Sequence, residues 1–159
     1  MEVPAMRRKI WSVLVAALAL FVIAQFVPYG RDRSNPPVLG EPSWNTPATR
    51  AIAQRACFDC HSNETRWPVY ARVAPVSWLV QHDVLEGRAA LNFSEWTRTQ
   101  PEAEDLSEKV LGREMPPAAY MAIHHDARLT DEERAQLARS LALLAGASPA
   151  GREHEPETE

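Results

Sequence analysis

Two cysteines and a histidine form the cluster of the sequence most suited to chemistry. Cys57 and Cys60 are the only cysteines in the chain, and His61 follows directly. Two thiols one helical turn apart can add to the two vinyl groups along one edge of a porphyrin, and the next histidine is then delivered to the iron. The run Cys57-Phe58-Asp59-Cys60-His61 matches C-x-x-C-H, the attachment signature of c-type haem. We predict one covalently attached haem c, with His61 as the proximal iron ligand.

The same cysteine spacing also occurs in redox dithiols and in zinc sites. A thioredoxin-like dithiol requires a βαβ context, and the sequence shows no alternating run of strand length. A structural zinc site needs one more ligand, which His82, His124 or His125 could supply. Both alternatives stay open, although a histidine directly after the second cysteine favours haem.

A methionine in a stiff loop is the candidate for the sixth iron ligand. The run Met115-Pro116-Pro117 lies between two predicted helices, and its prolines restrict the backbone that carries the thioether. A histidine and methionine pair is the common ligation of cytochromes c and raises the reduction potential. The alternatives are that Met115 only fills a gap in the core, or that His82 is the ligand. Weaker candidates are His124, His125 and Met121.

These residues need helices to position them. Thr46 is a suitable N-cap and Pro47 a suitable first helical residue, so we predict a helix that runs through Ala56 and ends near the cysteines. Apolar residues at helical spacing predict a second helix between Pro75 and Leu91. A third is predicted between Pro101 and Gly112, because acidic residues follow the proline as they do in a first helical turn.

The last helix has the strongest signals. Thr130 and Glu133 form a capping box, and leucines then repeat at helical spacing up to Gly146. With no strand pattern anywhere, the predicted fold class is all-α: an N-terminal transmembrane helix followed by a small helical domain.

An apolar segment near the N-terminus is the basis for the transmembrane prediction. From Ile10 to Val27 only Ser12 and Gln25 are polar, and at ~1.5 Å per residue this length approaches the roughly 30 Å of a bilayer core. The basic cluster at residues 7–9 would keep the N-terminus in the cytoplasm. The alternative is a cleaved signal peptide, since Ala17-Leu18-Ala19 fits a small-x-small cleavage site. Both interpretations export the domain that follows.

Composition divides the chain into four parts. We predict a membrane anchor or uncleaved signal over residues 1–28, a proline-rich linker over 29–45, a haem-binding domain over 46–147 and a disordered acidic tail over 148–159. The formal net charge of -4 makes nucleic acid a poor partner.

The sequence resembles a known family, the bacterial haem-binding domain proteins, which are small, membrane-anchored and c-type cytochrome-like. The resemblance implies a cytochrome c-like helical domain and covalent haem, with Met115 as the distal ligand. It is carried by Asn35-Pro36-Pro37-Val38, Cys57 to Thr65, Trp67-Pro68-Val69-Tyr70, Pro75-Val76-Ser77-Trp78, Glu86-Gly87-Arg88, Leu91 to Trp96, Met115-Pro116-Pro117, Tyr120, His124, Leu129 and Thr130.

The predicted function is one-electron transfer at the outer face of the inner membrane, with the haem domain in the periplasm and a redox partner protein of unknown identity. No nucleophile, base and orienting group occur together in the sequence, so hydrolytic catalysis has no support. We predict that the protein is not an enzyme. The alternatives are a peroxidase-like haem enzyme and a haem-based redox or gas sensor.

Overall fold

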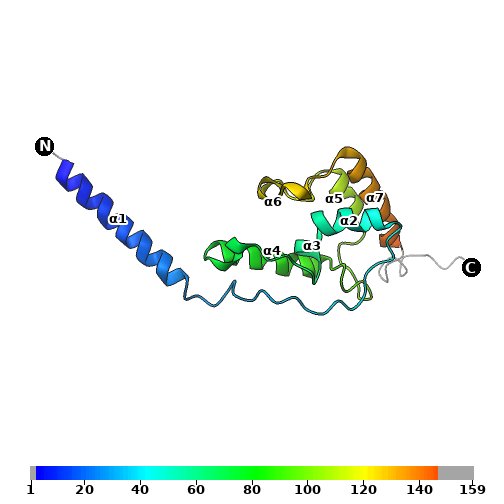
Figure 1. Ribbon diagram of the computed structural model, residues 1–159, viewed down its shortest axis with the longest axis horizontal. Coiled ribbons are helices and arrows are strands. Elements are labelled where there is room, and N and C mark those ends of the chain that lie inside the picture. Colours follow the sequence, from blue (N-terminus) through cyan, green and yellow to red (C-terminus); the bar gives the residue numbers. More distant parts are fainter. Residues whose placement is uncertain (1–2, 147–159) are drawn as a thin grey trace, which may run out of the picture. The chain divides into compact units, whose positions relative to one another are not determined.

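The computed structural model describes residues 3–146 of the chain, with side chains from Met6 onward. Within these residues it contains seven α-helices, two short 3-10 helices and no strand, which confirms the all-α prediction. The predicted acidic tail, residues 148–159, lies outside the described residues. Figure 1 shows the helices in chain order. They are α1 (Val3–Ala24), α2 (Pro47–Ala56), α3 (Phe58–His61), η1 (Val69–Arg72), α4 (Val76–Ala90), α5 (Leu106–Leu111), α6 (Ala118–Ile123), η2 (His125–Ala127) and α7 (Asp131–Gly146).

The chain divides into two compact units. Among the described residues, the first comprises 3–33 together with 67–82, and the second comprises 34–66 together with 83–146. Helix α4 begins in the first unit and ends in the second. All four predicted site residues belong to the second unit.

The predicted transmembrane anchor at residues 1–28 is contradicted. No helix in the part of the chain that the structure describes combines the length and the apolar character that crossing a membrane requires. Helix α1 has 22 residues, but its first third carries the basic cluster at residues 7–9. The uncharged remainder, residues 10–24, spans about 22 Å at ~1.5 Å per residue, short of the roughly 30 Å bilayer core. The single-pass inner-membrane location predicted from this segment is therefore wrong.

Helix α1 ends at Ala24, before the apolar run does, and the next residue, Gln25, bonds elsewhere in the first unit. The Gln25 side chain donates to the Ala74 carbonyl at 3.0 Å and accepts from the Ala74 amide at 3.1 Å. These two bonds fix Gln25 to the loop before α4, while the apolar residues Phe26 and Val27 lie beyond the helix. The sequence pattern alone gave no sign of this pairing.

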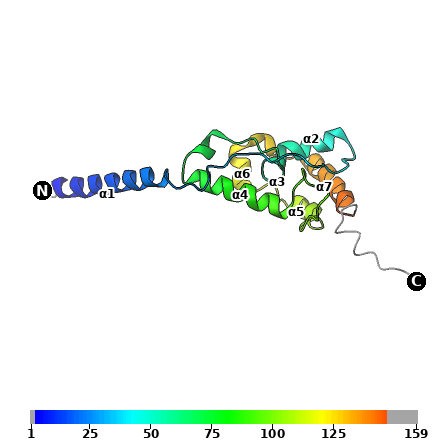
Figure 2. The same cartoon turned by 90° about the horizontal axis from the view of Figure 1, so that it is seen from below.

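The core of the second unit is built by α2, α5 and α7, with a group of aromatic residues beside them. Helix α7 packs against both α5 and α2, as both Figure 1 and Figure 2 show. Phe93 lies at the centre of the aromatic group, with ring centroids 5.5 Å from Phe58 and 5.7 Å from Trp96. Cys57 and Met115 both pack against this core. Its buried members are Ile52, Ala53, Ala56, Phe58, Leu91, Phe93, Trp96, Val110, Leu129, Leu137, Ala138, Leu141 and Leu144.

The predicted helix caps are confirmed. The Thr46 hydroxyl accepts from the amide of Thr49 at the start of α2. At the start of α7 the Thr130 amide donates to the Glu133 carboxylate at 3.0 Å, and the Glu133 amide donates to the Thr130 hydroxyl at 3.2 Å. This reciprocal pair is a capping box, which satisfies two amides that would otherwise have no helical partner.

The third predicted helix is shorter than expected. Residues 101–105 form turns, and α5 begins only at Leu106. The Glu102 amide bonds to the Ala90 carbonyl at 3.3 Å, so this stretch follows the end of α4 instead of starting its own helix. The buried side chain of Gln100 fixes the preceding turn by accepting from the Asn92 amide at 2.8 Å.

The second half of the predicted linker belongs to the second unit and is bonded to the rest of it. The Leu39 amide donates to the Ser94 carbonyl at 2.9 Å, and the Trp96 amide donates to the Gly40 carbonyl at 2.9 Å. Further along, the Glu41 carboxylate pairs with Arg50 of α2. These contacts bring residues 39–45 to the aromatic side of the core.

Candidate haem site

Helices α2 and α3 position the two thiols. Cys57 is the residue between them, ending α2 and preceding α3. The amides of Cys60 and His61 both donate to the Cys57 carbonyl, at 3.2 and 2.9 Å, so the motif forms one helical turn. Phe58 is only 1% exposed and fixes this turn in the core. The predicted spacing of the thiols, one turn apart, is therefore present in the structure.

Both thiols are free and partly buried. Burial raises the pKa of the Cys57 thiol to about 12 and that of Cys60 to about 11. The thiols are then protonated at neutral pH, whereas the attacking cysteine of a redox dithiol is a thiolate. No group of three or more His, Cys, Asp or Glu side chains among the described residues is arranged to hold a metal ion. Neither alternative to haem gains support from the arrangement of these residues.

The ring of His61 is held by one of its two nitrogens. Nδ1 lies 2.9 Å from the Gly87 carbonyl oxygen and 3.3 Å from that of Leu91, both in the last part of α4 or just after it. Burial lowers the pKa of His61, although these two carbonyls oppose the shift. The neutral ring thus has its proton on Nδ1, and no hydrogen bond within the described chain involves Nε2. A neutral imidazole with one nitrogen fixed and the other open is the form that binds iron.

A glycine allows α4 to approach the motif this closely. A Cβ atom built on Gly87 would lie 2.5 Å from the Cys60 carbonyl oxygen, which no side chain tolerates. The absence of a side chain lets the backbones of α3 and α4 touch, and this contact places the Gly87 carbonyl against His61. Gly87 was not among the site residues predicted from sequence. It lies within the run Glu86-Gly87-Arg88, which the resemblance included.

Buried polar residues hold the chain that follows the motif. Ser62 donates to the Phe58 carbonyl at 2.8 Å, and Arg88 of α4 donates to the Ser62 carbonyl at 2.8 Å. Asn92 donates to the side chain of Asn63 at 2.9 Å. Because buried polar groups are costly without partners, these bonds specify one conformation for the loop after His61.

Met115 lies in the second unit between α5 and α6. Its amide donates to the Lys109 carbonyl at 3.1 Å, and its own carbonyl accepts from Arg134 of α7 at 3.3 Å. Arg134 is only 6% exposed and also donates to the Val110 carbonyl at 2.7 Å. The backbone of Met115 is therefore fixed from both sides, and its partly buried side chain packs against the same core as Cys57.

The structure adds a network that the sequence analysis missed. Asp59, between the two cysteines, is only 8% exposed. Its carboxylate accepts from the Tyr120 hydroxyl at 2.7 Å and from the Arg66 guanidinium at 3.2 Å. Burial and the neighbouring Asp59 raise the pKa of Tyr120 well above its usual value, which keeps the hydroxyl a donor. In the sequence, the sign of this network was an acidic residue, Asp59, between the two cysteines.

The other candidate ligands have different surroundings. His82 is exposed on the part of α4 that belongs to the first unit. The ring of His124 stacks on Tyr120, with centroids 4.1 Å apart and planes inclined by 12°. His125 is exposed, and its Nε2 lies 3.0 Å from the Ala122 carbonyl oxygen. Met121 lines a surface hollow of about 400 Å³.

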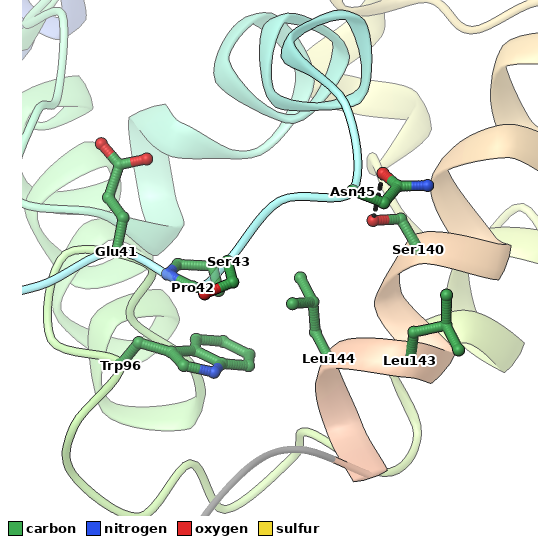
Figure 3. A pocket seen from close by; sticks show the side chains of 8 residues that line it. All are labelled: Glu41, Pro42, Ser43, Asn45, Trp96, Ser140, Leu143 and Leu144. Atoms are coloured by element: carbon green, nitrogen blue, oxygen red, sulfur yellow. Dashed lines mark hydrogen bonds between the residues drawn. The ribbon is translucent and has the colours of Figure 1, made fainter.

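Two cavities open on the surface of the second unit, and neither is lined by a residue of the Cys57–His61 motif. The hollow beside Met121 contains no cysteine and no histidine. The other cavity, about 260 Å³, is lined by Trp96 and by residues of α7 and the 41–45 segment, as Figure 3 shows. In it Ser140 donates to the side chain of Asn45 at 2.9 Å. The candidate haem site is thus defined by the sulfurs of Cys57 and Cys60 and by Nε2 of His61, and not by either of these cavities.

The donor set fits haem. Two protonated thiols one turn apart can form two thioethers, and the open Nε2 of His61 can bind iron. An all-helical unit with this motif defines the class of the protein as haem-binding.

A family model described as a haem-binding domain matches residues 19–142. The chain therefore belongs to the haem-binding domain family, as the sequence predicted, and haem is its cofactor. No curated protein and no solved structure gives a significant match.

Proposed function

We propose that the second unit is a cytochrome c-like one-electron carrier with a single haem c bonded to Cys57 and Cys60. The thiols of Cys57 and Cys60 would hold the haem by adding S–H across its two vinyl double bonds, which needs no leaving group and no external oxidant. His61 would be the proximal ligand and Met115 the distal ligand. When bound, the haem iron supplies a one-electron couple between its ferric and ferrous states.

The observation that carries this proposal is the position of the His61 ring. Its Nδ1 bonds to the carbonyls of Gly87 and Leu91, and these carbonyls belong to a segment of chain that also contacts Cys60. The ring therefore keeps its orientation independently of any iron bond. Such a second partner fixes the tautomer of an iron-binding histidine and increases its basicity.

Support for electron transfer comes from Met115 and from the exposure of the thiols. A thioether ligand favours ferrous iron and raises the reduction potential. Met115 packs against the same core as Cys57, with its backbone fixed by Lys109 and Arg134. Because Cys57 and Cys60 are both partly exposed, a redox partner protein would have access to the haem edge bonded to them. Catalysis and nucleic-acid binding are not part of the proposal.

Removal of the Met115 thioether tests the ligand assignment. In the matured full-length protein, Met115→Ala should abolish the sulfur-to-iron charge-transfer band at the red end of the ferric spectrum. It should also lower the reduction potential, by on the order of 0.1 V, since the axial ligand is a main determinant of that potential. The matched control is Met121→Ala, a partly buried methionine on α6, which should leave both quantities unchanged.

The same spectra separate the alternatives. If the wild-type ferric protein is five-coordinate and high-spin at neutral pH, the carrier proposal is wrong, and a peroxidase-like enzyme or a sensor is favoured. If the charge-transfer band is absent from the wild type and His82→Ala changes the low-spin spectrum, the distal ligand is His82 and the role given to Met115 is wrong.

A further inference from the structure

Helix α6 follows the Met115-Pro116-Pro117 run and has little hydrophobic anchoring. It contains six residues, none of them buried. A helix this short is not stable on its own, so contacts with the rest of the protein must determine its position. Tyr120 is the only residue of α6 with a polar side chain. Its hydroxyl bonds to Asp59 of α3 at 2.7 Å, which joins α6 directly to the haem motif.

Asp59 is a rigid acceptor for this bond. The Arg66 amide donates to its Oδ1 at 3.0 Å, and the Arg66 guanidinium donates to both carboxylate oxygens at 3.2 Å. The backbone carbonyl of Asp59 accepts from the Thr65 hydroxyl at 2.8 Å. A hydrogen bond to such a fixed, mostly buried carboxylate is stronger than one to an exposed side chain.

The chain on each side of α6 is held by other contacts. Before it, the backbone of Met115 is bonded to Lys109 and Arg134. After it, the Arg55 guanidinium donates to the carbonyls of Asp126 and Arg128, at 2.5 and 3.0 Å. Between these ends, the Tyr120 hydroxyl joins the segment 112–128 to α3.

We propose that Tyr120, through Asp59, is a positioning residue that holds the segment 112–128 closed over the haem motif and so keeps the Met115 thioether on the iron. This inference rests on the proposed function. Loss of the hydroxyl would let the segment open around its anchored ends, and the iron would exchange Met115 for an external ligand more easily. The chain would otherwise keep its fold and its attached haem.

The test measures how readily imidazole replaces Met115 in the matured, ferric, full-length protein. Tyr120→Phe keeps the ring that stacks on His124 and removes only the hydroxyl. We expect its affinity for imidazole to rise about tenfold, as loss of a charge-assisted hydrogen bond implies. Far-UV circular dichroism and the haem content should be unchanged. The matched control is Tyr29→Phe, at an exposed tyrosine of the first unit, which should bind imidazole as the wild type does.

A double-variant cycle separates loss of the Tyr120–Asp59 hydrogen bond from general destabilisation of the protein. Asp59→Ala, which removes the acceptor, should also raise imidazole affinity, and Tyr120→Phe added to it should raise the affinity no further, because both changes break the same bond. Wild-type affinity in Tyr120→Phe, or additive effects in the double variant, would overturn the inference.

The wild-type spectrum distinguishes this failure from failure of the proposed function. If the sulfur-to-iron band is present and Tyr120→Phe leaves the imidazole affinity unchanged, only the positioning role of Tyr120 is wrong. If the band is absent from the wild type, Met115 is not the ligand, and both the proposed function and the positioning role of Tyr120 are wrong.

Discussion

His61 donates its Nδ1 proton, because the two atoms that this nitrogen faces are carbonyl oxygens, which can only accept. This assignment leaves Nε2 with its lone pair directed away from the protein partners. Burial lowers the pKa of the ring, so the neutral form needed for iron binding is also the favoured form in the folded chain. Orientation, tautomer and charge state would thus be determined before the proposed bond to iron forms.

An ion pair at the edge of the second unit leads to a prediction about pH. Glu41 accepts from Arg50 at 2.5 and 2.7 Å and from the Trp44 indole at 3.1 Å. The Arg50 hydrogen bond is the main reason that the pKa of Glu41 lies below its usual value of 4.5. As the pH falls through 4.5, the unfolded state binds a proton that the folded state resists, so the free energy of unfolding decreases.

Substitution of Glu41 should therefore reduce the acid sensitivity of the fold. Glu41→Gln should lower the free energy of unfolding near neutral pH by up to about 1 kcal/mol, because the pair is partly exposed. This difference should shrink below pH 4.5, where the wild type loses the same contribution. Urea unfolding of the holoprotein at several pH values measures it, with Glu132→Gln at an exposed position of α7 as the control. A difference that stays constant down to the most acidic pH would contradict the prediction.

At the level of elements, the contact between α3 and α4 is the packing that the site depends on most. Gly87 and Cys60 approach so closely that any Cβ at position 87 would lie 2.5 Å from a backbone oxygen. A backbone atom cannot rotate away as a flexible side chain can, so the helices would have to separate. Separation would withdraw the Gly87 carbonyl from His61.

Gly87→Ala should destabilise the protein, although alanine is the better helix former. The gain from helix propensity is at most about 1 kcal/mol. The clash should exceed this gain and lower the free energy of unfolding by a net ~1–3 kcal/mol. Denaturant unfolding of the holoprotein checks this, with Gly40→Ala as the control, since a Cβ there meets only a Thr97 methyl at 3.5 Å. A Gly87→Ala protein as stable as the wild type would show that the helices are not in contact as described.

Across the whole molecule, the helices with local signals were predictable and those without were not. Both α2 and α7 carry N-cap residues whose bonds the structure contains. By contrast, α6 has no side-chain cap and no buried residue, so neither capping nor periodicity indicated it. The membrane prediction failed because an apolar run does not show where a helix stops: α1 ends at Ala24, so its uncharged part is shorter than the run. The next residue, Gln25, bonds to Ala74, which is distant in sequence.

The candidate site likewise combines residues that the sequence could predict with residues that it could not. Cys57, Cys60 and His61 form a contiguous motif, and Met115 lies in a recognisable proline loop, so all four could be selected from the sequence. Their partners could not be selected, because each comes from a separate element. The acceptors of His61 lie 26 and 30 residues further along the chain, and Tyr120 lies 61 residues from Asp59. Tertiary contacts of this kind leave no local pattern.

The claim that underlies this account is that the chain carries haem through bonds from both cysteines. The most direct test is the intact mass of the matured, full-length protein under denaturing conditions. We predict the mass of the polypeptide plus one haem for the wild type and the bare polypeptide mass for the variant Cys57→Ala/Cys60→Ala. A bare polypeptide mass for the wild type, or a haem adduct that persists in the double variant, would contradict the claim.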